Sequence, residues 1–104
     1  MQTRITARHF TLRDDLKEYI ESRMDRLQRY YDGITDARVV LTVDRGTPLE
    51  RHAEVVLSVF RQQLLAQDSA ETHELAVDAC VEGLRRQLLK YKSKLRRTDP
   101  KLYR

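Results

Sequence analysis

Side chains that could serve as nucleophiles, general bases or metal ligands are few and scattered along this sequence. The three histidines are separated by 43 and 21 positions, whereas metal-binding histidines are usually closely spaced. The single cysteine cannot supply a zinc cluster or an internal disulfide. None of these candidates lies in a nucleophile motif such as G-x-S-x-G: His9, His52, His73, Cys80, Ser22, Ser58, Ser69 and Ser93. We therefore expect a protein that is not an enzyme, with no catalytic residue, no metal and no cofactor.

The distribution of charge along the chain is more informative than its total. The 104 residues carry a formal net charge of +4. From Gly83 onward there are nine lysines and arginines against one acid, Asp99, which is a net charge of +8. The first 82 residues hold the other 11 cations and 15 acids. Such a concentration of positive charge at one end is typical of a protein that binds a polyanion.

Length and composition indicate a single soluble domain. The chain has a mass of 12.3 kDa, with 40% hydrophobic and 35% charged residues and a mean hydropathy of −0.66. No apolar run approaches the roughly 18 residues that a transmembrane helix needs, and Met1 is not followed by the apolar stretch of a secretory signal. We expect a cytoplasmic protein with no membrane contact and no small-molecule substrate.

The periodicity of apolar residues predicts the elements of the N-terminal part. Residues 2–10 alternate with a period of two, which is typical of a strand. Apolar residues then recur every three or four positions from Leu12 to Tyr31, which predicts a helix. We expect Thr11 to be the N-cap of this helix and Gly33 to be a left-handed C-terminal cap.

Three further strands are predicted in the middle of the chain. Residues 37–43 are rich in β-branched types, and residues 52–60 alternate again, so the two should form an antiparallel hairpin across a loop at residues 46–48. Residues 62–67 are assigned to a fourth strand because a long structureless connection would otherwise be needed before the next helix.

The last element is a long two-faced helix over residues 73–97, with Thr72 as its N-cap and Asp99-Pro100 marking its end. One apolar stripe should face the core and consists of Val77, Val81, Leu84, Leu88, Tyr91 and Leu95. Cys80 lies at helical spacing from this stripe and should be a small core residue.

Together these elements predict an α+β fold with the order β-α-β-β-β-α, in which two helices pack on one face of a four-stranded mixed sheet. The first two strands should be parallel because a helix connects them. We assign residues 1–97 to one domain and residues 98–104 to a short C-terminal tail.

The side of the last helix opposite the stripe carries Arg86, Lys90, Lys94 and Arg97. The first three of these follow one another at i+4, where like charges repel by a few tenths of a kcal/mol per pair, so a counter-charged partner would relieve the repulsion. The exposed side offers few groups that read base edges, which favours recognition of RNA phosphates. Tyr30 and Tyr31 are candidates for stacking on bases, although their helical spacing predicts that at least one lies in the core.

Five blocks carry a resemblance to a known family: QTRITA from Gln2, LQRYYDGI from Leu27, VVLTV from Val39, AVD from Ala76 and LRRQLLKYKSKL from Leu84. In these blocks the chain resembles the short ribosome hibernation promoting factors, a family that includes the ribosome-associated inhibitor. The fold of that family is β-α-β-β-β-α, similar to double-stranded-RNA-binding domains, and it agrees with the order predicted from periodicity. A glycine turn usual before the fourth strand is replaced here by Arg61-Gln62-Gln63.

The resemblance implies that the partner is the small ribosomal subunit with its ribosomal RNA, and that occupancy of the messenger and transfer RNA channel blocks translation. It implies phosphate contacts by Arg85, Arg86, Lys90, Lys92, Lys94, Arg96 and Arg97. Arg26 matches a basic position of the first helix, and Arg4 and Arg8 are further RNA-binding candidates because they share the polar face of the first strand. Long members of the family dimerise ribosomes through an additional domain, and because we expect no such domain here, dimerisation would require another factor.

Two other functions are compatible with the sequence. The basic helix would also suit an RNA-binding module that acts away from the ribosome. Alternatively, the apolar stripe of the last helix would suit a protein-interaction module that pairs with a partner helix.

Overall fold

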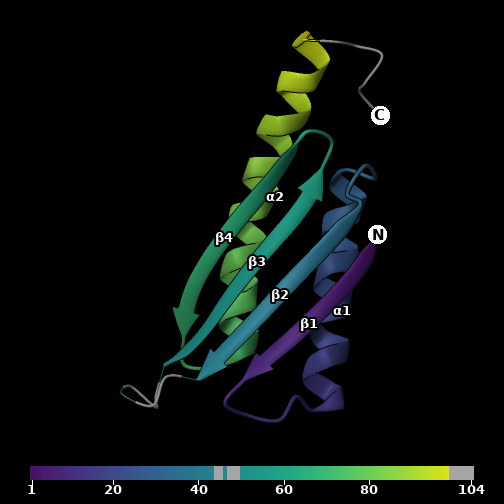
Figure 1. Cartoon of the computed structure of the whole chain (residues 1–104). Coiled ribbons are helices and arrows are strands. Elements are labelled where there is room, and N and C mark those ends of the chain that lie inside the picture. The colour runs from purple at the N-terminus through teal and green to yellow at the C-terminus, as the bar shows by residue number, and fades with distance from the viewer. Residues whose placement is uncertain (44–45, 47–49, 99–104) are drawn as a thin grey trace.

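The structure is a computed structural model that describes residues 1–43, 46 and 50–98 (Figure 1). Six elements follow one another along the chain: β1 (Gln2–Arg8), α1 (Asp14–Tyr30), β2 (Asp36–Val43), β3 (Arg51–Val59), β4 (Gln62–Ala70) and α2 (His73–Thr98). The order β-α-β-β-β-α predicted from the sequence is confirmed. The predicted loop at residues 47–48 and the predicted helix end at residues 99–100 lie outside the described residues.

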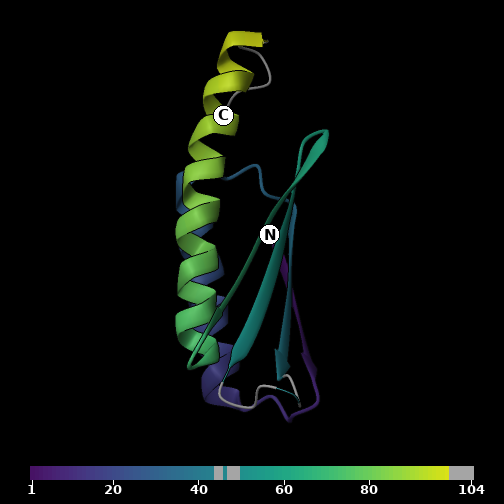
Figure 2. The ribbon, with the colours of Figure 1, turned by 90° about the vertical axis from the view of Figure 1, so that its left-hand side faces the viewer.

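The four strands form one mixed sheet in the order β1-β2-β3-β4. β1 and β2 are parallel, with Arg4 opposite Arg38, and the other neighbours are antiparallel. Both helices lie on one side of the sheet, so its other face is open (Figure 2). α2 packs against β3 and β4, and α1 packs beside α2. The predicted α+β architecture is therefore confirmed, including the parallel pairing of the first two strands.

The hydrophobic core lies between the sheet and the helices. Its fully buried side chains come from both helices and from the inner faces of β2 and β3, and they include Ile20, Met24, Leu27, Val39, Leu41, Val55, Leu57, Val77, Cys80, Leu84 and Leu88. The stripe predicted for α2 is buried, except that Val81 is half-buried at the edge of the core. Because the stripe is covered by the chain's own core, it is not a free surface for a partner helix.

The start of α1 differs from the prediction. β1 ends at Arg8 because His9 adopts a φ of 70°, which a strand cannot continue. The helix begins at Asp14 with Arg13 as N-cap, and no side chain caps it, so the prediction of Thr11 as N-cap is wrong. Asp14 and Asp15 in the first turn supply the negative charge that suits this end of a helix.

The end of α1 also differs, because Gly33 is not in a left-handed conformation. The helix stops when Tyr31 becomes extended at φ −158° and ψ 115°. The ring of Tyr31 is buried and meets the ring of Tyr91 edge-on, with 5.6 Å between centroids. A Cβ on Gly33 would overlap the Tyr31 ring. Glycine is therefore needed here for close packing rather than for its φ freedom.

β4 is longer than predicted and reaches Ala70, which pairs with Arg51 of β3. A two-residue turn, Phe60 and Arg61, joins β3 to β4. Arg61 adopts a φ of 64°, the left-handed region in which glycine is usual. The hairpin therefore closes without a glycine, and a long basic side chain occupies the position.

The start of α2 agrees with the prediction that Thr72 is its N-cap. The backbone N–H of Leu75 donates to the Thr72 hydroxyl at 3.1 Å. This bond satisfies one of the orphan donors at the helix start. Within the part of the chain that the structure describes, neither helix is long and apolar enough to cross a membrane.

Candidate nucleic-acid interface

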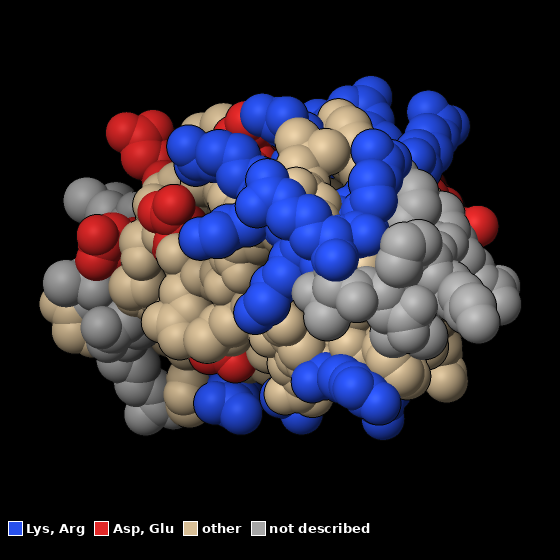
Figure 3. All heavy atoms as spheres, turned by 90° about the horizontal axis from the view of Figure 1, so that it is seen from above, with Lys and Arg blue, Asp and Glu red and all other residues tan. Residues whose placement is uncertain are grey.

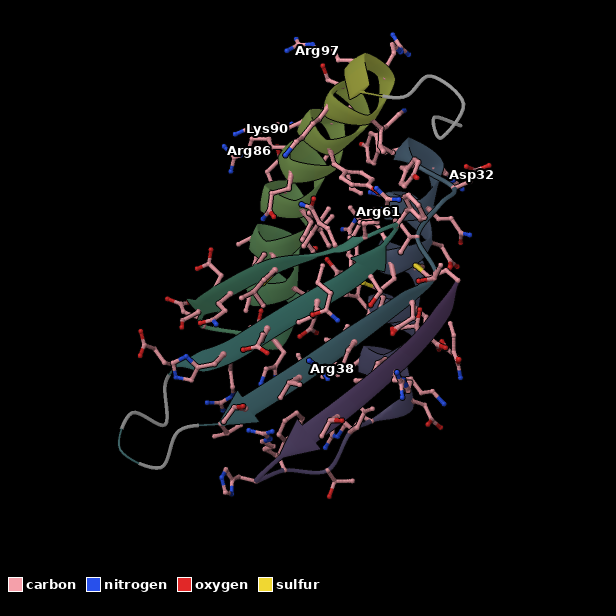
Figure 4. The ribbon with its side chains drawn as sticks, turned by 45° about the horizontal axis from the view of Figure 1, so that its top comes forward. Asp32, Arg38, Arg61, Arg86, Lys90 and Arg97 are labelled. Carbon is pink, nitrogen blue, oxygen red and sulfur yellow. The ribbon has the colours of Figure 1, made fainter. Side chains whose placement is uncertain are left out.

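The outer side of α2 is a continuous basic surface. Arg86, Lys90 and Arg97 are exposed there and point away from the sheet, on the side of α2 turned away from α1 (Figure 4). Among the described residues, no acidic side chain forms an ion pair with these three. Lys94 and Arg96 are also exposed on the same half of the helix. We call these five residues, Arg86, Lys90, Lys94, Arg96 and Arg97, the basic face.

Two of the predicted RNA contacts at the edge of this face have partners within the fold. The guanidinium of Arg85 pairs with Glu82 one turn earlier, with 2.6 Å between Nη2 and Oε1. The hydrogen bond from Arg85 lowers the pKa of the Glu82 carboxyl. Lys92 donates from Nζ to the carbonyl oxygen of Tyr30 at 2.6 Å, which places a cation at the C-terminal end of α1. Lys92 therefore helps to hold α2 against α1, whereas the Arg85–Glu82 pair lies within α2.

The basic face begins beside β4 and continues to the end of α2 that projects beyond the sheet. A helix of 26 residues is about 39 Å long, and its last turns rise past the β3–β4 turn (Figures 1 and 2). Seen from above this end, Lys and Arg side chains crowd the surface, and acidic side chains lie toward its margin (Figure 3). A projecting cationic rod of this kind can enter a groove or channel lined by phosphates.

The structure adds two cations that the sequence reasoning did not select. Arg29 lies in the last turn of α1, which ends beside Lys92 of α2. Arg61 lies at the β3–β4 turn, at the same end of the molecule as the basic face (Figure 4). The helical spacing from Arg26 to Arg29 could have indicated the first, whereas no local pattern indicates the second.

The three additional candidates lie in different places. Arg26 is exposed on α1, the helix that packs beside α2. Arg4 and Arg8 are exposed on the open face of the sheet, on the edge strand β1, whereas α2 covers the other face at β3 and β4. Arg4 is paired with Asp36 at 3.3 Å. The structure therefore does not bring Arg4 and Arg8 to the basic face, and their contact with RNA stays a prediction.

The side chains considered for catalysis form no assembled active site among the described residues. Cys80 is buried, its thiol lies near the carbonyl oxygens of Ala53 and Ala66, and burial raises its pKa to about 11. His52 Nδ1 and the Ser69 hydroxyl are 2.6 Å apart on the open face of the sheet, but Ser69 is exposed, His52 is only half-buried, and no third group among the described residues orients the imidazole. In the described ranges, no three His, Cys, Asp or Glu side chains are placed to hold a metal ion.

Comparison with known proteins identifies the family. A family model described as Sigma 54 modulation protein / S30EA ribosomal protein matches residues 3–96. The chain belongs to this family. The S30EA match spans all six elements, so the whole described fold is the family's domain. This membership confirms the resemblance seen in the sequence blocks.

Individual members of the S30EA family are similar over most of their length. The chain is 33% identical over 94 residues to a ribosome hibernation promoting factor of Azotobacter vinelandii, covering 90% of this chain and 85% of the relative. It is 29% identical over 96 residues to the ribosome hibernation promoting factor of Escherichia coli K12, covering 92% and 98%. These names denote ribosome-associated factors and not enzymes, in agreement with the prediction that this chain is not an enzyme.

A solved structure shows the same S30EA fold. A ribosomal subunit interface protein from Coxiella burnetii superposes with a TM-score of 0.81, at 22% identity, covering 89% of this chain and 99% of that one. At this identity the likeness supports the architecture alone. The arrangement of two helices on one face of a four-stranded sheet is thus shared.

Proposed function

We propose that this protein is a ribosome hibernation factor that binds the small ribosomal subunit and blocks translation by occupying the channel for messenger and transfer RNA. The basic face of α2 contacts phosphates of ribosomal RNA. The single observation that carries this proposal is the run of exposed cations on the C-terminal half of α2, in a chain whose first 82 residues are net acidic. The names of the hibernation factor relatives point to the ribosome as the partner.

The fold supports recognition of RNA through its phosphates rather than through the edges of its bases. The basic face consists of Lys and Arg, which pair with phosphate through charge, and α2 is held rigidly by its buried stripe. Arg86, Lys90 and Lys94 repel one another in the free protein, and phosphates would relieve this repulsion. The N-terminal half of α2, from His73 to Leu84, carries no lysine or arginine that could pair with phosphate. The protein should therefore dock by one end.

The experiment is sedimentation of the protein with purified small subunits across a salt series. If roughly six phosphates are contacted, the logarithm of affinity should fall against the logarithm of salt concentration with a slope of about −4 to −5. Lys90→Glu should weaken binding and reduce the magnitude of that slope by about 1 or more. Arg38→Glu is the matched control, because Arg38 is exposed on the open face of the sheet and changes the net charge equally (Figure 4).

Three results would contradict the proposal. One is a wild-type protein that does not pellet with small subunits at low salt. Another is a slope near zero. The third is an equal loss for Lys90→Glu and Arg38→Glu, because net charge and not the basic face would then determine binding. Sedimentation with large subunits serves as the specificity control.

The channel itself is tested by competition. Small subunits loaded with messenger RNA and a P-site transfer RNA should retain less of the protein than vacant subunits, and an excess of the protein should inhibit translation in a reconstituted system. Unchanged binding to loaded subunits would place the site elsewhere on the subunit. The protein-interaction alternative is not favoured, because Leu84 and Leu88 of the stripe are fully buried within the chain.

A further inference from the structure

The β3–β4 turn presents an exposed aromatic ring at the basic end of the molecule. Phe60 and Arg61 connect Val59 to Gln62, the last residue pair of the hairpin. Phe60 is 44% exposed, and the guanidinium carbon of Arg61 lies 5.0 Å from the centroid of its ring. A ring so exposed contributes little to the core. The turn therefore leaves much of an aromatic ring and the side chain of Arg61 accessible to solvent.

The two-residue turn requires a left-handed residue, and the chain places an arginine there rather than a glycine. Arg61 holds a φ of 64°, a conformation that glycine adopts without steric cost. Strained residues persist where the surrounding structure holds them, and they are concentrated at functional sites. The conformation directs Arg61 toward the end of the molecule at which the basic face lies (Figure 4).

Hydrogen bonds fix the turn against the basic half of α2. The Tyr91 hydroxyl donates to the carbonyl oxygen of Phe60 at 2.7 Å, and burial raises the pKa of Tyr91 to about 12, so the hydroxyl keeps its proton. Gln87 of α2 donates from Nε2 to the carbonyl oxygen of Leu65 on β4 at 2.9 Å. The backbone of the turn is therefore held at the level of Tyr91, which lies between Lys90 and Lys94 in the sequence of α2.

We propose that the Phe60–Arg61 turn is a stacking site for an unpaired base of the RNA whose phosphates the basic face contacts. This inference rests on the proposed function, which supplies the RNA. Aromatic rings and guanidinium planes are the two side-chain surfaces on which unstacked bases lie, and here the two are already adjacent. A nucleotide on this site would place its base on the ring and its phosphates near Arg61 and α2. The protein would thus prefer RNA with unpaired residues to a continuous duplex.

The test compares two labelled oligonucleotides of about 12 nucleotides, one of uridines and one abasic throughout, which have equal length and charge. The wild type should bind the uridine strand more tightly. Phe60→Ala should lose roughly tenfold in affinity for the uridine strand and nothing for the abasic strand. Phe60→Trp should keep the preference. Leu75→Ala is the matched control, since Leu75 is 53% exposed at the acidic start of α2 and should have no effect.

Equal wild-type affinity for both strands, or an equal loss on both in Phe60→Ala, would overturn the stacking site. Thermal melting of Phe60→Ala checks that the hairpin is intact. If it is not, the preference of Phe60→Trp for the uridine strand tests the stacking site independently. The subunit experiment separates the two proposals. If Lys90→Glu loses subunit binding while Phe60→Ala changes neither subunit binding nor oligonucleotide binding, the proposed function is retained and the stacking site is rejected. If the wild type binds the uridine strand more tightly but does not pellet with small subunits, the stacking site would be retained and the proposed function rejected.

Discussion

The Tyr19 hydroxyl of α1 lies 2.8 Å from both carboxylate oxygens of Asp78 on α2. Arg23 completes this cluster, because its Nε is 3.0 Å from the same carboxylate and its Nη2 donates to the Tyr19 hydroxyl at 2.9 Å. The cluster joins the two helices near the start of α2. Asp78 belongs to one of the sequence blocks that carry the family resemblance, and the structure gives it a packing role rather than a role in RNA contact.

Tyr19→Phe tests the contribution of this cluster to stability. The change removes the hydrogen bond that the hydroxyl donates to Asp78 and the one that it accepts from Arg23, but leaves the Arg23–Asp78 ion pair, so the free energy of unfolding should fall by about 1–2 kcal/mol. Urea unfolding followed by circular dichroism measures it. Tyr30→Phe is the control, because Tyr30 is exposed at the end of α1 and its hydroxyl makes no hydrogen bond among the described residues. Equal stability of the two variants would show that the Tyr19 bond contributes nothing.

His73 should make stability depend on pH. It is buried at the start of α2, stacks on Phe10 with 4.6 Å between ring centroids, and lies 3.2 Å through Nε2 from the carbonyl oxygen of Thr42. Burial is the largest cause that lowers the pKa of His73 below its ordinary value of 6.5. The folded state therefore binds this proton less well than the unfolded state, so stability is retained above about pH 6.5 and lost as the pH falls below it.

The measurement is the urea midpoint of the wild type and of His73→Gln between pH 7.5 and pH 5.5. The midpoint of the wild type should fall on acidification, and the fall should be smaller in His73→Gln, which can still donate to Thr42 but does not titrate. Parallel curves for the two proteins would assign the pH dependence to other groups.

Two glycines should respond to alanine with opposite signs. Gly33→Ala forces the buried Tyr31 ring to move from its contact with Tyr91, which should cost about 1–3 kcal/mol of stability. Gly83→Ala should instead stabilise by about 0.5–1 kcal/mol, because Gly83 lies within α2 and an added Cβ has nothing within 4 Å. Thermal unfolding of both variants checks the pair. Destabilisation by both would show that α2 needs flexibility at Gly83.

Most of the fold could be predicted because burial imposes a period on the sequence. The stripe of α2 and the alternation in β1 each place one face against the core, and both are as expected. The end of β4 could not be predicted in this way, because residues 68–70 are held by backbone pairing with β3 and have no apolar pattern. The prediction of a left-handed glycine cap at the end of α1 was wrong for a related reason. The conformation of Tyr31 and Gly33 depends on Tyr91, which is 60 residues later in the chain.

The candidate site was predictable in part. Composition alone indicates the basic face, because its residues follow one another on one helix. The separation of Arg4 and Arg8 from that face was not predictable, since a shared polar face on a strand does not say which side of the sheet the helices cover. Arg61 was missed because a single cation at a turn does not belong to a repeating pattern such as the helical spacing of the basic face. Its relevance depends on the hydrogen bond that places the turn beside α2.

The strain at Arg61 gives a prediction that separates stability from binding. Arg61→Gly and Arg61→Ala both remove the cation and its contact with Phe60, but only glycine adopts the φ of 64° without steric cost. Relief of about 1–2 kcal/mol of left-handed strain, less about 0.4–1 kcal/mol for the greater freedom of glycine in the unfolded chain, should make Arg61→Gly more stable than Arg61→Ala by about 0.5–1 kcal/mol. Both should weaken binding to the uridine strand equally. Equal stability would show that the turn is unstrained, and unequal binding would show that backbone conformation and not the guanidinium determines the contact.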